Sequence, residues 1–418
     1  MSKKATGLYY NRDFVKFWLG QTVSQFGSGI TGIALPLTAV LLLAATPSQM
    51  GILSALDGAA VLAIGLFAGV WVDRIRRRPL LIATDLGRAL ILSTIPLAAL
   101  FGVLHIAQLY AVAALTGMLT VIFNVANQSF LPSLIPQTAL VEGNSKLGVS
   151  DSLAEIGGPA VAGPLVQLIS APFAVLFDAL SFLFSALCLG LIRKSEPPVA
   201  AEGQRESIWR DLIQGISEVL KNPLLRSLAI GVGTFNFFGN FIGALYALYV
   251  VRELHAAPVF LGFLIATGGV SALVGAFIAE RIVRRFGLGA TAGATLFIYG
   301  ATGLLIPLAA GPTAVALSFL FTSQLIGDAS VSIHLITEVS LRQSIVPGNM
   351  LGRINASLQF LSQGVAPIGA LLAGILGGLI GLRLTILIGV LGVMAAGALL
   401  FLSPIRKISE IKSQRPPV

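Results

Sequence analysis

The sequence predicts an all-α protein that crosses a membrane twelve times and is built from two similar six-helix halves. Three observations predict this fold. Of the 418 residues, 56% are hydrophobic and only 11% are charged, and the mean hydropathy is +0.90, a composition that excludes a water-soluble enzyme. The hydrophobic residues form stretches long enough for transmembrane helices, each of which needs about 20 apolar residues. The two halves of the chain also share sequence motifs.

Twelve hydrophobic spans are separated by charged residues or by proline and glycine. Connections such as 44–49 and 170–172 are so short that successive helices must run antiparallel. The 46 glycines and 20 prolines fit a membrane, where neighbouring helices satisfy freed backbone groups and small residues permit close packing. The predicted spans are 14–43, 50–72, 80–103, 108–131, 144–169, 173–192, 224–251, 260–279, 288–310, 313–337, 353–380 and 384–403.

The positions of lysine and arginine predict that both termini lie in the cytoplasm. When the loops are assigned alternately to the two sides, all 27 of these residues except Arg252 and Arg383 fall on one side. Cytoplasmic loops carry such an excess, so we expect an integral protein of the plasma (cytoplasmic) membrane. The same rule explains the net charge of +9 without a nucleic-acid partner.

The longest hydrophilic stretch, 193–222, divides the chain near its middle. Within it, apolar residues recur every four positions over 207–220, a pattern that favours an amphipathic helix on the membrane surface. Four parts are therefore predicted. They are an N-terminal six-helix bundle at 1–192, a cytoplasmic linker at 193–222, a C-terminal six-helix bundle at 223–404 and a cytoplasmic tail at 405–418.

Two pairs of motifs relate the halves. The segment 69–78 recurs as 276–285, with an acid, an arginine and two further arginines at the same spacing. A second pair relates 135–158 to 346–369 through an apolar-Pro dipeptide followed by Leu, Asn, Leu and Gly at matching distances. Two halves built alike are typical of transporters with parallel repeats, which bind substrate between the halves near the membrane midplane.

The segment 69–78 resembles the signature Gly-x-x-x-Asp-Arg-x-x-Arg-Arg of the major facilitator superfamily. Together with the twelve spans, this resemblance covers essentially the whole chain. Motifs at 17–27, 85–88, 178–182 and 347–353 look like those of macrolide-efflux proteins and the enterobactin exporter. The resemblance implies a gating role for the signature, whose second copy has Ala276 and Glu280 in place of Gly and Asp. The implied gating residues are Gly69, Asp73, Arg74, Arg77, Arg78, Glu280 and Arg281.

Elementary electrostatics supports a gate at this position. Asp73 follows a predicted helix C-terminus, where the helix dipole disfavours a carboxylate, so it needs cationic partners. A charge network that forms in one conformation and breaks in the other would bias an alternating-access equilibrium. A basic loop that serves orientation only is the alternative.

The fifth predicted span carries a cluster of glycine and proline. It resembles the Gly-Pro stretch of exporters in the family, which implies a kink and closure of the outer side. Proline removes a backbone hydrogen bond and glycine lets helices cross closely; ordinary helix packing is the alternative. The cluster is Gly157, Gly158, Pro159 and Gly163, followed by Pro164.

Ionisable residues inside the spans are costly and are therefore functional candidates. An apolar environment favours the protonated form of a carboxylate, which can then exchange a proton for substrate. The predicted proton carriers are Asp328, Asp151 and Glu155, followed by Asp57, with hydrogen bonding between helices as the alternative for each. Other ionisable residues are expected to have structural roles. Asp85 and Arg88 are one turn apart and should form a pair, and Asp178 lies near the outer interface.

Polar side chains on several spans predict the lining of a substrate cavity. Aromatic residues between 235 and 249 suit a bulky apolar ligand, with core packing as the alternative for most of them. The cavity candidates are Gln21, Gln25, Asn124, Asn127, Asn236, Asn240 and Gln324.

Together these features predict a secondary transporter, specifically a proton-coupled exporter of amphiphilic or hydrophobic small molecules such as drugs, macrolides or siderophores. An uptake or lipid-moving carrier of the same fold is the alternative, and a membrane enzyme or receptor is a third possibility. The sequence has no nucleotide-binding loop, metal-binding pair or nucleophile motif. We therefore expect no enzymatic activity, metal or cofactor, and a proton or other ion gradient as the energy source. The expected partners are a small amphiphilic substrate, protons and the lipid bilayer, with the protein as a monomer.

Overall fold

The computed structural model describes residues 8–72, 75–194, 196, 208–346 and 350–408. This described part is helical and contains no strand, as predicted. Twelve of its helical segments are long and apolar enough to cross a membrane. The chain divides into two compact units. Unit 1 comprises residues 1–45, 56–203 and 257–266, and unit 2 comprises residues 46–55, 204–256 and 267–418.

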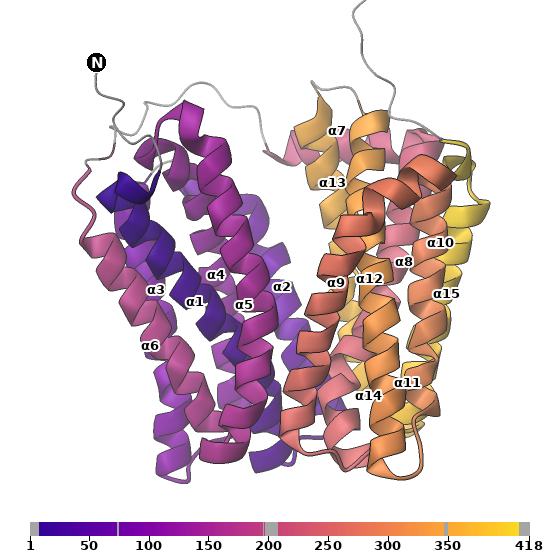
Figure 1. Ribbon diagram of the computed structural model, residues 1–418, viewed down its shortest axis with the longest axis horizontal. Helices are drawn as coiled ribbons and strands as arrows, with labels where there is room; N and C mark the ends of the chain where they lie inside the picture. Colours follow the sequence, from indigo (N-terminus) through magenta and orange to yellow (C-terminus); the bar gives the residue numbers. More distant parts are fainter. Residues whose placement is uncertain (1–7, 73–74, 195, 197–207, 347–349, 409–418) are drawn as a thin grey trace, which may run out of the picture. The chain divides into compact units, whose positions relative to one another are not determined.

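The helices of unit 1 follow the predicted spans closely (Figure 1). Four helix pairs make most of its contacts: α1 packs on α5 and α6, and α3 packs on α4 and α6. The bounds are α1 Arg12–Leu37, α2 Pro47–Val72, α3 Arg77–Leu100, α4 Ile106–Leu134, α5 Leu140–Ile169 and α6 Ala171–Gly190, with the first turns of α2 counted in unit 2.

Unit 2 repeats this packing. Its main contacts are α8 with α14 and α15, and α10 with α12 and α15, which are the equivalents of the four pairs in unit 1. The bounds are α7 Ile208–Lys221, α8 Pro223–Leu248, α9 Pro258–Phe286, α10 Leu288–Gly303, α11 Leu305–Leu308, α12 Thr313–Ile345, α13 Leu351–Gln363, α14 Ala366–Leu379 and α15 Leu382–Leu402.

The repeat has a constant offset of 211 residues, the distance from the start of α1 at Arg12 to the start of α8 at Pro223. The same offset separates the first residues of α2 and α9, α3 and α10, α5 and α13, and α6 and α15. Even irregular backbone follows it. The first long helix of each unit ends in a π-helical turn, Thr38–Leu42 and Tyr249–Glu253, and the residues with positive φ at Ala44 and His255 are again 211 apart.

Two predicted spans are interrupted by proline. The predicted span 288–310 is divided between α10 and α11, and the span 353–380 between α13 and α14. Pro307 and Pro367 have no N–H to donate to the carbonyl four residues earlier, and each proline ring crowds that carbonyl. The helices therefore break one turn before these prolines, although 353–379 remains long and apolar enough to be a single membrane span.

The amphipathic helix predicted at 207–220 is present as α7. Its packed face is not the predicted apolar stripe, because Gly215 and Val219 are buried whereas Leu220 is 52% exposed. Gly215 lies against Arg353 and Ser357 of α13, and Arg353 Nη1 donates to Gln214 Oε1 at 2.8 Å. The helix therefore packs on α13 within unit 2.

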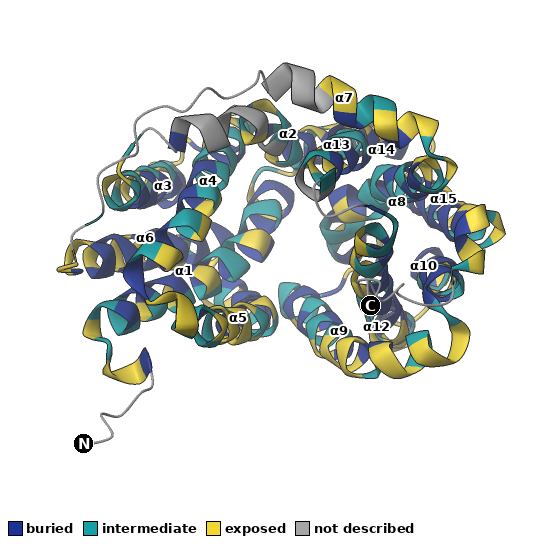
Figure 2. Cartoon of the chain, turned by 90° about the horizontal axis from the view of Figure 1, so that it is seen from above, coloured by how far each residue is buried: buried dark blue, intermediate teal, exposed yellow. Residues whose placement is uncertain are grey.

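Each unit has its own apolar core. In unit 1, Phe17 and Phe130 are buried and make an edge-to-face contact with ring centroids 5.5 Å apart. In unit 2, Leu296, Val393 and Leu400 are fully buried in the corresponding cluster. Figure 2 shows the buried residues on the faces that helices of one unit turn toward each other, with exposed residues on the outside.

The start of α8 provides a test of local helix stability. The side chain of Asn222 accepts hydrogen bonds from the backbone N–H of Leu224 (2.9 Å) and Leu225 (3.4 Å). We expect Asn222→Ala to cost about 0.5–2 kcal/mol and to speed amide hydrogen exchange in the first turn of α8. Asn222→Asp keeps an acceptor and should retain the protection; equal exchange in both variants would contradict the capping role.

Candidate functional site

Each unit contains one carboxylate set against a glycine of a neighbouring helix. In unit 1, Asp57 of α2 lies against Gly117 of α4, where an added Cβ would be 3.5 Å from Asp57 Oδ1. In unit 2, Asp328 of α12 lies against Gly268 of α9, and Asp328 Oδ2 fills the space that a Cβ on Gly268 would need. With the offset of 211, Asp57 corresponds to Gly268 and Gly117 to Asp328. The two units thus use the same helix pair but carry the acid on opposite helices.

Asp328 is half-buried in an aromatic environment within unit 2. The phenol groups of Tyr246 and Tyr299 interact with it electrostatically. The hydroxyl of Tyr246 is buried and has no hydrogen-bond partner in the described part of the chain. Phe235 extends the aromatic surface through an edge contact with Tyr299, at 5.9 Å between ring centroids. This arrangement provides a negative charge beside several π faces, a combination that attracts organic cations.

A buried histidine lies behind this aromatic surface. His334 of α12 is fully buried, and its Nδ1 is 2.8 Å from the carbonyl oxygen of Ala292. Because a carbonyl only accepts, Nδ1 must carry the proton and Nε2 is an acceptor. The ring also makes an edge contact with Phe235, with centroids 5.9 Å apart. The contact fixes the orientation of Phe235 and thereby of the aromatic surface.

The two predicted carriers on α5 have a more open environment. Asp151 and Glu155 are both exposed in unit 1, and Asp151 interacts with the side chain of Gln25 on α1. Near them, Trp18 Nε1 and Thr22 Oγ1 each donate to Ser150 Oγ at 2.9 Å. The α1–α5 contact is therefore partly polar.

The predicted cavity residues differ in their surroundings. Gln21 is buried, at 4% exposure, whereas Gln25 and Asn124 are exposed and Asn127 and Gln324 are half-buried. On α8, Asn236 Nδ2 donates to the carbonyl of Ser362 at 2.9 Å. Asn240 Nδ2 donates to the carbonyl of Asn236 at 2.8 Å. These two amides therefore already have backbone partners within unit 2.

Part of the gating signature lies outside the described residues, namely Asp73 and Arg74. Gly69 lies in α2 and Arg77 begins α3. Arg78 Nε and Nη2 donate to the carbonyls of Leu189 and Gly190 at 2.8 and 2.5 Å. These carbonyls are at the C-terminus of α6, where a cation is favoured. Arg78 thus ties the start of α3 to the end of α6.

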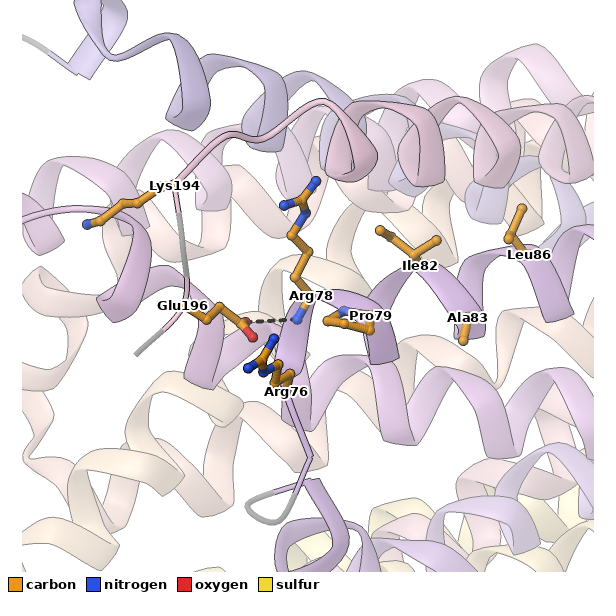
Figure 3. Close-up of a pocket in the computed structure, with 8 residues that line it drawn as sticks. All are labelled: Arg76, Arg78, Pro79, Ile82, Ala83, Leu86, Lys194 and Glu196. Carbon is orange, nitrogen blue, oxygen red and sulfur yellow. Dashed lines mark hydrogen bonds between the residues drawn. The ribbon is translucent and has the colours of Figure 1, made fainter. Parts of the chain in front are cut away.

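A surface pocket adjoins Arg78 (Figure 3). The backbone N–H of Arg78 donates to Glu196 Oε1 at 2.8 Å, which places a carboxylate at the N-terminus of α3. The pocket has a volume of about 450 Å³. Its lining residues are Arg76, Arg78, Pro79, Ile82, Ala83, Leu86, Lys194 and Glu196.

The second copy of the signature does not occupy the equivalent place. Glu280 follows Asp73 by 207 residues, whereas the helices repeat every 211. Glu280 and Arg281 therefore lie inside α9, which continues to Phe286. There Glu280 Oε1 is 3.7 Å from Arg284 Nε one turn later, with both side chains well exposed. The described contacts of this copy are within one helix.

The glycines of α5 permit very close helix contacts inside unit 1. A Cβ on Gly158 would lie 2.7 Å from the Cα of Gly29 on α1, and one on Gly157 would lie 2.5 Å from the ring of Phe26. Gly163 lies against the backbone of Val259 in the first turn of α9. Pro159 and Pro164 are accommodated within a continuous helix.

Sequence reasoning missed one group of buried charges. Asp85 and Arg88 form the predicted pair, but Asp178 is only 2% exposed, so it does not reach the interface. Asp178 instead interacts electrostatically with Arg88. The available signal was the small residue Gly27 on the first span, which leaves space for a side chain from another helix. In the described part of the chain, no group of three or more His, Cys, Asp or Glu residues is suited to a metal ion.

Comparison with known proteins identifies the family. The model of the Major Facilitator Superfamily matches residues 17–368. This chain belongs to the Major Facilitator Superfamily. Its relatives include the uncharacterized transporter YfiS of Bacillus subtilis, which is 26% identical over 88% of this chain and 87% of its own length. The multidrug efflux pump Tap of Mycolicibacterium fortuitum is 24% identical, with coverages of 91% and 93%.

Solved structures of the superfamily share the fold at low sequence identity. A bacterial homologue of the iron transporter ferroportin, in an inward-facing state, has a TM-score of 0.72 and 18% identity over 93% of this chain and 98% of that one. The nucleoside transporter NupG has a TM-score of 0.74 and 12% identity over 93% of this chain and 98% of that one. A protein of this family is a transporter integral to a membrane, and nothing in its relatives indicates catalysis.

The close contact between α5 and α1 provides a second test. We expect Gly158→Val to lower the free energy of unfolding by about 1–3 kcal/mol, because the new side chain must separate two backbones. Thermal unfolding of the detergent-solubilised protein measures the effect. Gly148→Val is the matched control on the same helix, because nothing lies within 4 Å of its Cβ position. Equal unfolding temperatures for the two variants would show that the contact is not tight.

Proposed function

We propose that this chain is a proton-coupled exporter of amphiphilic small molecules, with a preference for cations. The observation that carries this proposal is the environment of Asp328. A carboxylate within a membrane-spanning helix is costly when ionised. A proton or a cationic substrate can neutralise it, and the two therefore compete for one site. Competition for one carboxylate is the simplest basis for exchanging substrate against protons.

The surroundings of Asp328 favour a bulky ligand. Tyr246, Tyr299 and Phe235 supply aromatic surface within unit 2. A desolvated cation gains about 2 kcal/mol or more over such a ring, so an organic cation would benefit from the rings as well as from the carboxylate. The efflux function of the related pump Tap supports the outward direction for this chain.

Asp57 gives unit 1 an equivalent carboxylate at the same helix pair. A second carboxylate lets the protein hold a proton or a cation in either unit during the transport cycle. Asp151 and Glu155 remain further candidates, because their exposure leaves them open to protons. We propose that the protein works as a monomer of the cytoplasmic membrane with both termini inside, driven by the proton gradient without a cofactor.

The direct test uses purified protein in liposomes with an imposed pH gradient and an internal pH-sensitive dye. A panel of organic cations, macrolides and catecholate siderophores serves as substrate. We expect substrate-dependent proton movement by the unmodified protein and none above protein-free liposomes for Asp328→Asn. Glu218→Gln, a change on the exposed face of α7, is the control and should transport normally. Normal coupling by Asp328→Asn would contradict the proposed role.

A second variant separates the position of the carboxylate from its charge. Gly268→Ala places a methyl group where Asp328 Oδ2 now lies, so the carboxylate must move although its charge remains. We expect weaker substrate binding, measured by fluorescence quenching with an organic cation, together with a folded protein. Gly243→Ala on α8 has open space around it and should bind normally. Unchanged binding by Gly268→Ala would show that the ligand does not depend on this position of the carboxylate.

A further inference from the structure

Three buried charged side chains lie together in unit 1, away from the carboxylates discussed above. Asp85, Arg88 and Asp178 are exposed by only 0%, 4% and 2%. Arg88 Nη2 donates to Asp85 Oδ1 at 2.5 Å, and the guanidinium also interacts electrostatically with Asp178. Its central carbon lies 4.3 Å from the ring centroid of Phe123 and 4.0 Å from that of Phe182. The two rings pack against the cation and keep water away from it.

Asp178 is surrounded by hydroxyl groups. Its Oδ1 accepts hydrogen bonds from Ser181 Oγ at 3.1 Å and from Ser28 Oγ at 3.4 Å, and the hydroxyl of Thr31 also interacts with it. Gly27 of α1 makes room for this group, because a Cβ at that position would lie 2.7 Å from Asp178 Oδ1. Asp178 is therefore solvated by hydroxyls, which can either donate to a carboxylate or accept from a carboxylic acid.

The remaining polar groups around the cluster carry no charge. Thr120 of α4 accepts from Arg88 Nη1 at 3.4 Å, and Ser185 of α6 interacts with Asp85. Together with Ser28 and Thr31 of α1 and Ser181 of α6, these are the groups that face the cluster from the four helices around it. In the described part of unit 1, no second cation faces the two carboxylates. The fixed charges of the cluster are therefore two negative and one positive.

The repeat shows that the fold does not require these charges. At an offset of 211, Asp85, Arg88 and Asp178 correspond to Leu296, Tyr299 and Gly389. The space is filled differently in unit 2, where the ring of Phe238 packs on Gly392 and the backbone of Phe238 lies 3.0 Å from the Cβ position of Gly389. The equivalent helix pair, α8 with α15, is thus held there by apolar packing. A purely structural role does not explain why unit 1 carries three charges.

We propose that the cluster of Asp85, Arg88 and Asp178 is a proton-binding site that holds one exchangeable proton on Asp178. Two ionised carboxylates and one guanidinium would leave an uncompensated negative charge in a dry interior, which is strongly unfavourable. One bound proton makes the cluster neutral. Asp85 stays ionised because the guanidinium contacts it directly, and Asp178, whose hydrogen-bonding neighbours are hydroxyls, holds the proton. The hydroxyls of Ser28 and Ser181 accept the hydrogen bond of the acid form.

The site links proton occupancy to the packing of α1. Ser28 and Thr31 contact Asp178 from α1, and Gly29 on the same helix packs against Gly158 of α5. Loss of the proton would place a negative charge beside this part of α1 and change its hydrogen bonds to α6. Because the proton is bound at rest, its presence does not depend on the substrate or direction proposed above.

Infrared difference spectroscopy of the full chain in lipid nanodiscs tests the proton count at neutral pH. The carbonyl stretch of a protonated carboxyl group identifies the bound proton. We expect Asp178→Asn to lose one such band. Asp85→Asn should lose it as well, because Asp178 must then ionise to neutralise Arg88. Glu218→Gln should leave the band unchanged. Retention of the full carboxylic acid signal in Asp178→Asn would overturn the proposal.

The pH dependence of stability gives a second, independent test. The folded protein holds a proton on Asp178 that the unfolded chain releases, so stability must fall as pH rises from the range of ordinary carboxylate titration toward that of the cluster. One proton changes the folding equilibrium by about tenfold per pH unit. We expect this slope to be absent in Asp178→Asn and present in Glu218→Gln. An unchanged slope in Asp178→Asn would overturn the proposal, as would stabilisation by Na⁺ over choline that Asp178→Asn abolishes.

Discussion

The free-energy cost of an ionised carboxylate in an apolar helix bundle is the constraint on which the rest of this structure depends. The two units meet this cost in different ways. Asp57 and Asp328 each lie against a glycine of a neighbouring helix, which leaves the carboxylate room at a helix contact. Asp85 and Asp178 are instead buried with Arg88 and with hydroxyl groups. A chain that only needed to cross a membrane would have no use for these acids, so their presence indicates work on protons or cationic ligands.

Glycine lets this chemistry fit into a repeated framework. With the constant offset of 211 residues, Gly158 and Gly369 lie against the backbone carbonyls of Phe26 and Phe237, which are themselves 211 apart. The helix packing is thus the same in both units, while the polar chemistry differs. Unit 2 places aromatic side chains around one acid, and unit 1 buries a charged trio. A duplicated framework with unequal polar groups allows one unit to contact the ligand while the other responds to proton occupancy.

The sequence was sufficient for the membrane spans, because length and hydropathy determine them residue by residue. It also contained the breaks at Pro307 and Pro367, which follow from the missing N–H of proline. The environment of Asp178 was beyond it, since the position of a residue along a span does not reveal which neighbouring helix it faces. The second signature copy illustrates the same limit. Its motif matched at a spacing of 207, and only the backbone offset of 211 showed that Glu280 lies inside α9.

The central claim is that a proton and a cationic ligand compete for Asp328. Calorimetric titration of the purified protein with an organic cation, in buffers of different ionisation enthalpy, counts the protons released on binding. The account predicts proton release near neutral pH that falls as pH rises and the carboxylate loses its proton before the ligand arrives. It also predicts no such release from Asp328→Asn. Binding of the cation by the unmodified protein without any proton release across this pH range would contradict the account.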